Sequence, residues 1–337
     1  MSAEPDRLQA HAHRGTPPGI ARPTPQAQTE PRWIERPANK GLLLGFLGVA
    51  LFAATLPMTR LAVGTVDAPL MSGVFVAMGR AVVAAALSLL FLLATRAPLP
   101  QRRDFWPLAI TSAGVVFGFP LFSSVAMRYV EAVHASVIVG VLPLATAAVG
   151  ALLHRQRPSS GFWACAALGS ALVVAFAVLR SGSAGLGVHP ADLLLLAAML
   201  CAAIGYAYGA RLSQHMRAEH VICWALVIAL PITLPMAFTA RPQMPLPASA
   251  WWGFVYTAVF SMWIGFFAWY RGLALGGTVR VSQVQLVQPF MSMLFAVPLL
   301  GERLDAVTLG FAVAVIATVF MGKKMPVHAN AHRPERN

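Results

Sequence analysis

The stretch PLMSGVFVAMGRAVVAAALSLLFLL, residues 69–93, carries a single charged side chain, Arg80, among apolar and small residues. A helix of about 20 predominantly apolar residues is long enough to cross the hydrocarbon core of a bilayer. Backbone polar groups in lipid must be satisfied within the segment, so such a stretch should be helical. Ten such stretches occur, and we expect them to span the membrane at residues 41–63, 69–93, 105–127, 131–153, 160–179, 190–212, 221–240, 249–273, 278–300 and 305–322.

The composition agrees with an all-α integral membrane protein. Hydrophobic residues make up 58% of the 337 residues, charged residues make up 11%, and the mean hydropathy is +0.67. A soluble domain carries about 25% charged residues. The connections between the apolar stretches are too short to hold a soluble catalytic domain.

The positive charges indicate the topology. If the N-terminus faces the cytoplasm, 19 of the 25 Lys and Arg lie in cytoplasmic segments, five lie in external connections, and Arg80 lies within a span. Positive residues favour the cytoplasmic side, so both termini should be cytoplasmic. Residues 1–39, rich in Pro and Arg, should then be a disordered cytoplasmic tail, and residues 323–337 a short basic one. The net charge of +13 therefore needs no nucleic-acid partner.

An internal repeat divides the chain. A constant offset of 146 residues aligns Phe105-Trp106 with Trp251-Trp252, Thr111 with Thr257, Ser136 with Ser282, Pro143 with Pro289, Leu153 with Leu299, and Arg157 with Arg303. Each half, 40–180 and 188–322, then holds five spans. Because five is odd, the second half enters the membrane from the opposite side, which makes an inverted repeat. Inverted repeats are typical of secondary transporters, whose binding sites lie near the midplane between the halves.

The end of the fourth helix in each half carries a family signature. The second half reads Val287-Gln288-Pro289 and then Leu299-Leu300-Gly301-Glu302-Arg303. The first half ends Leu152-Leu153-His154-Arg155-Gln156-Arg157, with Gln156 at the acidic position. Over residues 41–322 the chain resembles the EamA family of the drug/metabolite transporter superfamily. Arg80 matches a position where that family often carries Arg. The resemblance implies a carrier of small metabolites such as amino acids or drug-like compounds, often an exporter, in a bacterial inner membrane.

Two features that the sequence lacks, a phosphate-binding loop for ATP and a carboxylate within the spans, limit how transport could be driven. The chain has no G-x-x-x-x-G-K-[ST] phosphate-binding loop. Proton-driven carriers usually keep a carboxylate inside the membrane, whereas the twelve acidic residues here lie in tails, in a loop, or at span ends. These features favour facilitated diffusion or exchange, or coupling through a group other than a carboxylate.

Several polar and aromatic residues within the spans are candidates for lining a substrate cavity. Arg80 is the clear mid-span charge, and it either attracts a substrate carboxylate or ties helices together through backbone carbonyls. Gln285 and Gln288 lie on one helical face beside the kink expected at Pro289, and they either line the cavity or join helices. Aromatic side chains that could stack on an apolar solute, or simply pack, are Tyr206, Trp263 and Tyr270.

Four residues are candidates for hinges or gates. Pro143 and Pro289 occupy equivalent positions and should break the fourth and ninth helices, since proline cannot donate a backbone hydrogen bond. The offset also pairs His134 with Arg280, which would place them at opposite mouths of the bundle. His134 could titrate near neutral pH, although a lone interfacial histidine is more often only a hydrogen-bonding residue.

Metal and cofactor sites are not expected. Glu131-x-x-His134 has the spacing of half a di-iron site, but a second such set is missing. Cys165, Cys201 and Cys223 form neither a disulfide framework nor a zinc spacing.

The sequence therefore predicts a ten-helix secondary transporter that works by alternating access, with a small-molecule substrate, the lipid bilayer around it, and a homodimer left open as its assembly. Four pairs of glycines have G-x-x-x-G spacing and should be close helix contacts, and they are Gly41/Gly45, Gly114/Gly118, Gly205/Gly209 and Gly272/Gly276. A membrane-embedded enzyme is an alternative, but it needs a nucleophile and a base at depth, and no G-x-S-x-G or H-E-x-x-H occurs. A non-transporting membrane scaffold is a third class, which the inverted repeat disfavours.

Overall fold

The computed structural model describes residues 37–153, 157–180, 189–276, 281, 283–325 and 327–328. Its first part contains α1 (Pro37–Ala53), α2 (Thr55–Val63), α3 (Gly73–Ala94), α4 (Arg102–Thr111), η2 (Ser112–Gly118), α5 (Phe119–Ala126), α6 (Ala132–Val139), α7 (Leu142–Leu153) and α8 (Ser160–Arg180). Its second part contains α9 (Pro190–Leu212), α10 (Ala218–Thr239), α11 (Ala248–Val255), η3 (Tyr256–Ile264), α12 (Gly265–Gly276), η4 (Gln283–Val287), α14 (Gln288–Leu300) and α15 (Ala306–Lys324). Two short strands, β1 (Arg157–Pro158) and β2 (Val327–His328), pair antiparallel.

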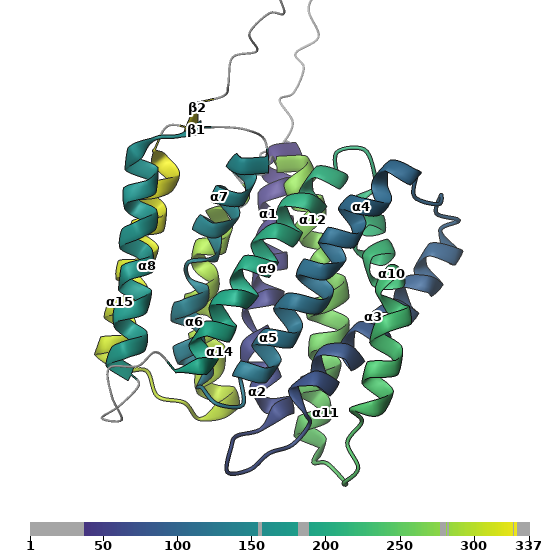
Figure 1. Cartoon of the computed structure of the whole chain (residues 1–337), viewed down its shortest axis with the longest axis horizontal. Helices are drawn as coiled ribbons and strands as arrows, with labels where there is room; N and C mark the ends of the chain where they lie inside the picture. Colours follow the sequence, from purple (N-terminus) through teal and green to yellow (C-terminus); the bar gives the residue numbers. More distant parts are fainter. Residues whose placement is uncertain are drawn as a thin grey trace, which may run out of the picture.

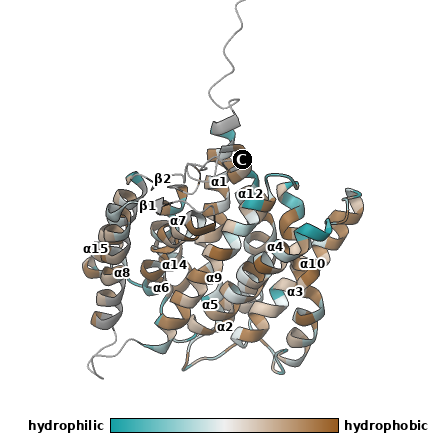
Figure 2. Cartoon of the chain, turned by 45° about the horizontal axis from the view of Figure 1, so that its top comes forward, coloured by the Kyte–Doolittle hydropathy of each residue, from teal (hydrophilic) through white to brown (hydrophobic). Residues whose placement is uncertain are grey.

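The described chain is helical and apolar enough for a membrane. Seven helical segments have the length and hydropathy to cross one, and these are Asn39–Val63, Gly73–Ala94, Arg102–Ala126, Ala132–Gly150, Pro190–Leu212, Ala218–Thr239 and Ala248–Gly276. Three shorter apolar helices lie at Ser160–Leu172, Val284–Leu300 and Ala306–Gly322. Hydrophobic residues, coloured brown, recur along the helices in Figure 2. The prediction of a helical membrane protein is confirmed.

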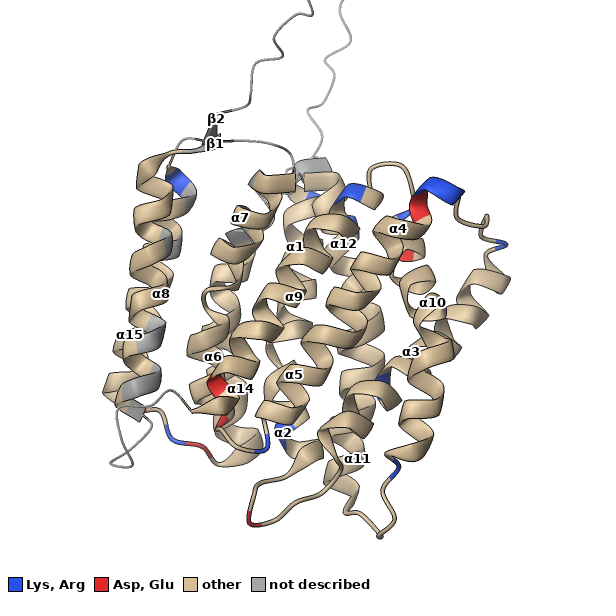
Figure 3. Cartoon of the chain, viewed as in Figure 1, with Lys and Arg blue, Asp and Glu red and all other residues tan. Residues whose placement is uncertain are grey.

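The helices stand side by side between two faces of the molecule (Figure 1). We call the face where α1 begins and α15 ends the termini face, and the face where α2 ends and α3 begins the distal face. Charged residues gather toward these two faces, and the helical ribbon between them carries few (Figure 3).

Five of the expected spans are not continuous α-helices, and one of these, the ninth, changes from the 3-10 helix η4 to α14 at Gln288. The first is interrupted at Ala54 between α1 and α2, and the fourth at residues 140–141 between α6 and α7. Pro143 and Pro289 are each the second residue of the helix that follows an irregular segment. The third and eighth expected spans contain the π-helical segments η2 and η3, whose last residues lie 146 residues apart. Irregular helical turns therefore recur at the offset found in the sequence.

Glycine pairs bring helices from the two parts of the chain into close contact. A β-carbon on Gly41 would lie 2.3 Å from the backbone nitrogen of Gly276, so α1 and α12 touch backbone to backbone. A β-carbon on Gly114 would lie 2.4 Å from the carbonyl oxygen of Cys201, so η2 and α9 are equally close. Small residues allow such approach in membranes. The prediction of close helix contacts at the glycine pairs is confirmed, and α1 and α9 each pack on the opposite part of the chain.

Candidate functional site

A small cavity lies at the centre of the bundle, between the two parts of the chain. Its volume of about 20 Å³ is room for roughly one water molecule. The lining residues come from nine helical elements, and they are Phe52, Thr55, Arg80, Val115, Phe119, Ala202, Tyr206, Ser261, Met262, Phe266 and Gln288. The structure is therefore closed around this cavity, which we call the central cavity.

Arg80 is the one formally charged side chain in the lining of the central cavity. It lies in α3 with only 1% of its surface exposed. Its Nε and Nη1 atoms are buried without a hydrogen-bond partner among the described residues. An unpaired buried charge is costly, and such groups are normally paired or hydrogen-bonded. Arg80 thus has two donors available for an anionic group that enters the cavity.

Two amide side chains beside this region also have unused hydrogen-bonding atoms. Gln288 Oε1 is buried without a partner, and so are both amide atoms of Gln285. Three hydroxyl groups nearby are satisfied, since Thr55 Oγ1 lies 2.8 Å from Ser261 Oγ and the Ser292 hydroxyl donates to the Ala53 carbonyl at the α1–α2 break. The unused atoms are therefore concentrated on Arg80 and the two glutamines within this group.

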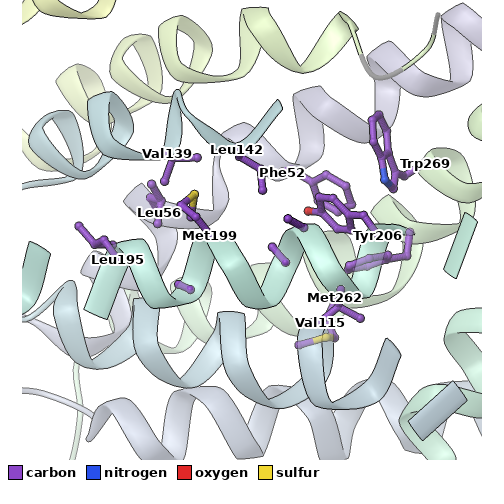
Figure 4. Close-up of a cluster of buried hydrophobic side chains, with 14 of the residues drawn as sticks. Phe52, Leu56, Val115, Val139, Leu142, Leu195, Met199, Tyr206, Met262 and Trp269 are labelled. Carbon is purple, nitrogen blue, oxygen red and sulfur yellow. The ribbon is translucent and has the colours of Figure 1, made fainter. Parts of the chain in front are cut away.

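An aromatic cluster forms the apolar side of the central cavity (Figure 4). Figure 4 shows Phe52, Tyr206 and Trp269 gathered on one side of α9. The Phe52 ring lies 6.4 Å from Tyr206, 5.0 Å from Phe266 and 6.3 Å from Trp269, measured between centroids. Tyr206 lies 5.8 Å from Trp269 and 6.0 Å from Phe266. Rings at these separations and tilts pack favourably. The cavity thus combines a cationic group with aromatic walls, an arrangement that suits a solute with an anionic and an apolar part.

The residues predicted to line a cavity do not all meet there. Arg80, Gln288 and Tyr206 line the central cavity, and Gln285 lies in η4, three residues before Gln288. Trp263 packs instead against Phe91 and Phe267.

Tyr270 packs between helices, one of the two alternatives that the sequence left open for it. Its side chain is fully buried, and its hydroxyl donates to the Gly205 carbonyl at 3.3 Å, which fastens α12 to α9. Sequence reasoning missed Phe52, Thr55 and Ser261, because single aromatic and hydroxyl residues in an apolar stretch resemble packing residues.

The predicted gating residues lie in different settings. Pro143 and Pro289 follow the two helix interruptions described above. His134 Nε2 lies 2.8 Å from Asp192 Oδ1, a contact that the sequence did not suggest. Arg280 lies outside the described residues.

A wider opening lies on the distal face. It has a volume of about 800 Å³ and is lined by Arg60, Leu61, Gly64, Thr65, Ala68, Leu70, Glu131, Ser249, Leu300, Gly301, Glu302, Arg303 and Asp305. We call it the distal vestibule. Thr55 of the central cavity and Arg60 of the vestibule both lie on α2, five residues apart, which is about 7.5 Å along a helix. Roughly one and a half helical turns therefore separate the two spaces.

Glu302 joins the two parts of the chain at the vestibule. Its two carboxylate oxygens accept hydrogen bonds from the backbone N–H groups of Ala132 at 2.9 Å and Val133 at 2.8 Å, in the first turn of α6. Burial raises the pKa of Glu302 above its ordinary value, and the charge of Glu131 adds to this. The two backbone hydrogen bonds and the charge of Arg60 act in the opposite direction.

Loss of the Glu302 contact should loosen α6. Glu302→Ala removes both bonds to the helix N-terminus and should lower the unfolding free energy by about 1–2 kcal/mol. Glu302→Gln, which keeps one acceptor oxygen, should cost about half as much. Melting temperatures of the purified protein in detergent would show this order, and equal stability of all three proteins would contradict it.

The raised pKa adds a pH dependence to this comparison. A carboxyl group whose pKa is raised on folding stabilises the folded state most when protonated, and the benefit falls as pH rises from 4.5 through the raised value. The stability difference between wild type and Glu302→Gln should therefore shrink over that interval.

Within the part of the chain that the structure describes, no group of three or more His, Cys, Asp or Glu side chains is arranged to hold a metal ion.

Comparisons with known proteins point to one family. The model of the EamA-like transporter family matches residues 39–179 and again residues 189–322. A Bacillus subtilis protein, named as the uncharacterized transporter YdeK, is 41% identical over 289 residues, which cover 85% of this chain and 98% of the relative. The aromatic amino acid exporter YddG of Ancylobacter novellus is 25% identical over 261 residues, or 77% of this chain and 88% of the exporter.

A solved crystal structure shares the fold. It superposes with a TM-score of 0.58 at 19% sequence identity and covers 83% of this chain and 95% of its own. Two matches to the family model together cover most of the chain, and a relative at 41% identity is covered over nearly its whole length. The chain belongs to the EamA-like transporter family.

Proposed function

We propose that this protein is a secondary transporter that moves small metabolites by alternating access, as an exporter or an exchanger. The observation that carries the proposal is Arg80, whose guanidinium is buried with two unused donors in a cavity lined by both parts of the chain. Family membership supports the same class of function. A membrane-embedded enzyme and a non-transporting scaffold remain as outcomes of the test below.

The proposed architecture has ten membrane-spanning helices in two inverted five-helix halves, 40–180 and 188–322. Seven long apolar segments and three shorter ones support this number. The π-helical segments η2 and η3, and the interruptions before Pro143 and Pro289, recur at the 146-residue offset. An inverted pair of halves has two equivalent conformations, each open to one side.

The proposed substrates are carboxylate-bearing compounds, amino acids first among them. Arg80 can donate two hydrogen bonds to a carboxylate, and a cationic drug-like compound would meet its positive charge. The rings of Phe52, Tyr206 and Phe266 give the apolar part of the solute a flat surface. The name of the Ancylobacter novellus relative, an aromatic amino acid exporter, fits this pairing of groups.

The central cavity is too small for such a solute in the present conformation. Its volume of about 20 Å³ compares with about 800 Å³ for the distal vestibule. We therefore assign the structure to a state in which the centre is closed. Opening toward the distal face would require the packed segments beside Thr55 to separate.

We place the protein in a bacterial inner membrane as a multi-pass protein, with the termini face in the cytoplasm. Reporter fusions should be active in the cytoplasm after Arg102 and His215, and in the periplasm after Pro242. Nineteen Lys and Arg on the predicted cytoplasmic side are the reason. A periplasmic signal after His215 would contradict the five-plus-five arrangement.

Exchange in proteoliposomes tests the proposed function. Vesicles that contain the purified protein and an unlabelled amino acid should take up the labelled amino acid faster than protein-free vesicles. Large aromatic and branched amino acids, aromatic carboxylic acids without an amino group, and aromatic amines without a carboxylate form the panel. Uptake of the carboxylates but not of the amines is expected. If none of these compounds is taken up, the result would favour a non-transporting scaffold. If one of them is chemically converted, the result would favour a membrane-embedded enzyme.

A further inference from the structure

The central cavity holds unused hydrogen-bonding atoms of two kinds. Arg80 contributes two N–H donors, whereas Gln288 contributes an amide oxygen, which accepts. Both side chains are buried, at 1% and 6% exposed, and both line the same small cavity. A buried polar atom without a partner is costly, so a solute that supplies both partners gains from each of them. The proposed function uses the donors of Arg80 and gives the oxygen of Gln288 no role.

Gln288 is held in the cavity wall by a contact across the α1–α2 break. Pro57 has no N–H group to donate to the carbonyl of Ala53, the last residue of α1. Ser292, one turn after Gln288 on α14, donates its hydroxyl to that carbonyl instead. Thr55, two residues after Ala53, lines the central cavity. The bond therefore fixes the start of α14 beside the cavity and keeps the Gln288 side chain in place.

The described lining of the central cavity contains neutral acceptors and no carboxylate. The hydroxyl groups of Thr55 and Ser261 lie 2.8 Å apart and bond to each other. Among the buried side-chain atoms of this lining, Gln288 Oε1 is the acceptor that has no partner. A carboxylate at this position would pair with Arg80 and occupy its donors, whereas a neutral amide leaves the guanidinium free. One solute can therefore meet a free cation and a free neutral acceptor.

An α-amino acid carries the two complementary groups. Its carboxylate can accept from Arg80, but its ammonium group has N–H donors that a guanidinium cannot accept. Burial of an ammonium group without an acceptor is costly, and the Gln288 oxygen removes that cost. A carboxylic acid without an amino group satisfies Arg80 and leaves the Gln288 oxygen unpaired. Sites built to bond an N–H group discriminate strongly against an analogue that lacks it.

We propose that Gln288 recognises the α-amino group of the solute, its amide oxygen accepting a hydrogen bond from the ammonium group while Arg80 binds the carboxylate. The central cavity then selects α-amino acids over carboxylic acids of the same shape. This inference rests on the proposed function, because it concerns the solute of the same cavity. Arg80 alone would bind both classes of carboxylate, and Gln288 separates them.

Binding of matched compounds to the purified protein in detergent tests this role. Phenylalanine and 3-phenylpropionate differ only in the amino group, and leucine and 4-methylpentanoate form a second such pair. Affinities are obtained from the rise in melting temperature with ligand concentration. We expect wild type to bind each amino acid about 10- to 100-fold more tightly than its partner, as a hydrogen bond from a charged donor allows. 3-Phenyllactate, whose hydroxyl group keeps the size of phenylalanine, should lie between.

Two substitutions separate recognition from folding. Gln288→Met keeps the length of the side chain without its amide, and it should reduce the preference to about threefold or less by weakening only the amino acid. Thr233→Val is the matched control, because it removes a buried hydroxyl that also has no partner among the described residues but lies on α10, outside the cavity lining. This variant should keep the wild-type preference. A loss of folded protein would lower the binding of both compounds equally and leave their ratio unchanged.

The outcomes distinguish this inference from the proposed function. Equal binding of phenylalanine and 3-phenylpropionate by wild type, or an unchanged preference in Gln288→Met, would overturn the role of Gln288. If Gln288→Met does not fold, Gln288→Asn, which draws the amide back by one methylene, must lower the preference instead. If wild type binds amino acids with this preference but exchanges none of them, the transport proposal fails and the role of Gln288 stands. If no compound binds, the proposed substrate class and the role of Gln288 fail together.

Discussion

Replacing Arg80 with alanine should reduce the exchange rate roughly 10- to 100-fold without unfolding the protein. A hydrogen bond to a charged group contributes about 1.5–3 kcal/mol, which corresponds to this range of rates if the carboxylate of the solute binds Arg80. Arg80→Lys keeps the charge but loses the planar arrangement of donors, so it should restore only part of the rate. Rates are measured in proteoliposomes and normalised to the amount of folded protein.

Stability separates this role from a structural one. Because Arg80 Nε and Nη1 have no partner among the described residues, Arg80→Met should leave the melting temperature unchanged or raise it. Arg128 is the matched control, since its guanidinium donates to the carbonyls of Val63 and Met71. Arg128→Met should therefore lower the melting temperature. An Arg80→Met protein that is clearly less stable, yet transports normally per folded molecule, would assign Arg80 a structural role.

Alanine at either proline should bias the protein toward one side of the membrane. Pro289→Ala restores an N–H group at residue 289, which allows η4 and α14 to continue as one helix. Pro143→Ala does the same between α6 and α7. Since the two halves are inverted in our proposal, the two substitutions should favour opposite conformations. The rate at which single cysteines are labelled from each side of the membrane should change by several-fold relative to wild type, and in opposite directions for the two variants.

Pro235 provides the control for this pair. It lies inside α10, which runs without interruption from Ala218 to Thr239. Pro235→Ala should leave the accessibility of both faces as in wild type. Accessibility that is unchanged in all three variants would reduce Pro143 and Pro289 to packing residues.

The helical membrane fold could be predicted because lipid imposes simple rules on sequence. Long apolar stretches such as Gly73–Ala94 must be helices, and the glycine pairs indicated where two of them touch. The π-helical turns of η2 and η3 could not be foreseen, since they change which backbone groups pair without changing hydropathy. The interruption at Ala54 does have a mark in the sequence, because Pro57 has no N–H group to donate to the carbonyl of Ala53.

The central site was only partly predictable. Arg80 stood out because an isolated charge in a span is costly, and Tyr206 because of its position in mid-span. Trp263 and Tyr270 also lie in mid-span, yet the structure shows Trp263 packed against Phe267 and the Tyr270 hydroxyl bonded to the Gly205 carbonyl. His134 and Asp192 are in contact although they lie 58 residues apart in sequence, and no local sequence pattern predicts such a contact.

Two-sided access to the central cavity tests alternating access most directly. Ser261 lines the cavity, and Ser261→Cys changes its size little in a protein whose three native cysteines are replaced by serine. A small anionic, membrane-impermeant thiol reagent is applied to the inside or the outside of oriented vesicles. We predict labelling from each side, and protection from both sides by an amino acid that the protein exchanges. Labelling from one side alone under all conditions, with no protection by any exchanged solute, would contradict alternating access through this cavity.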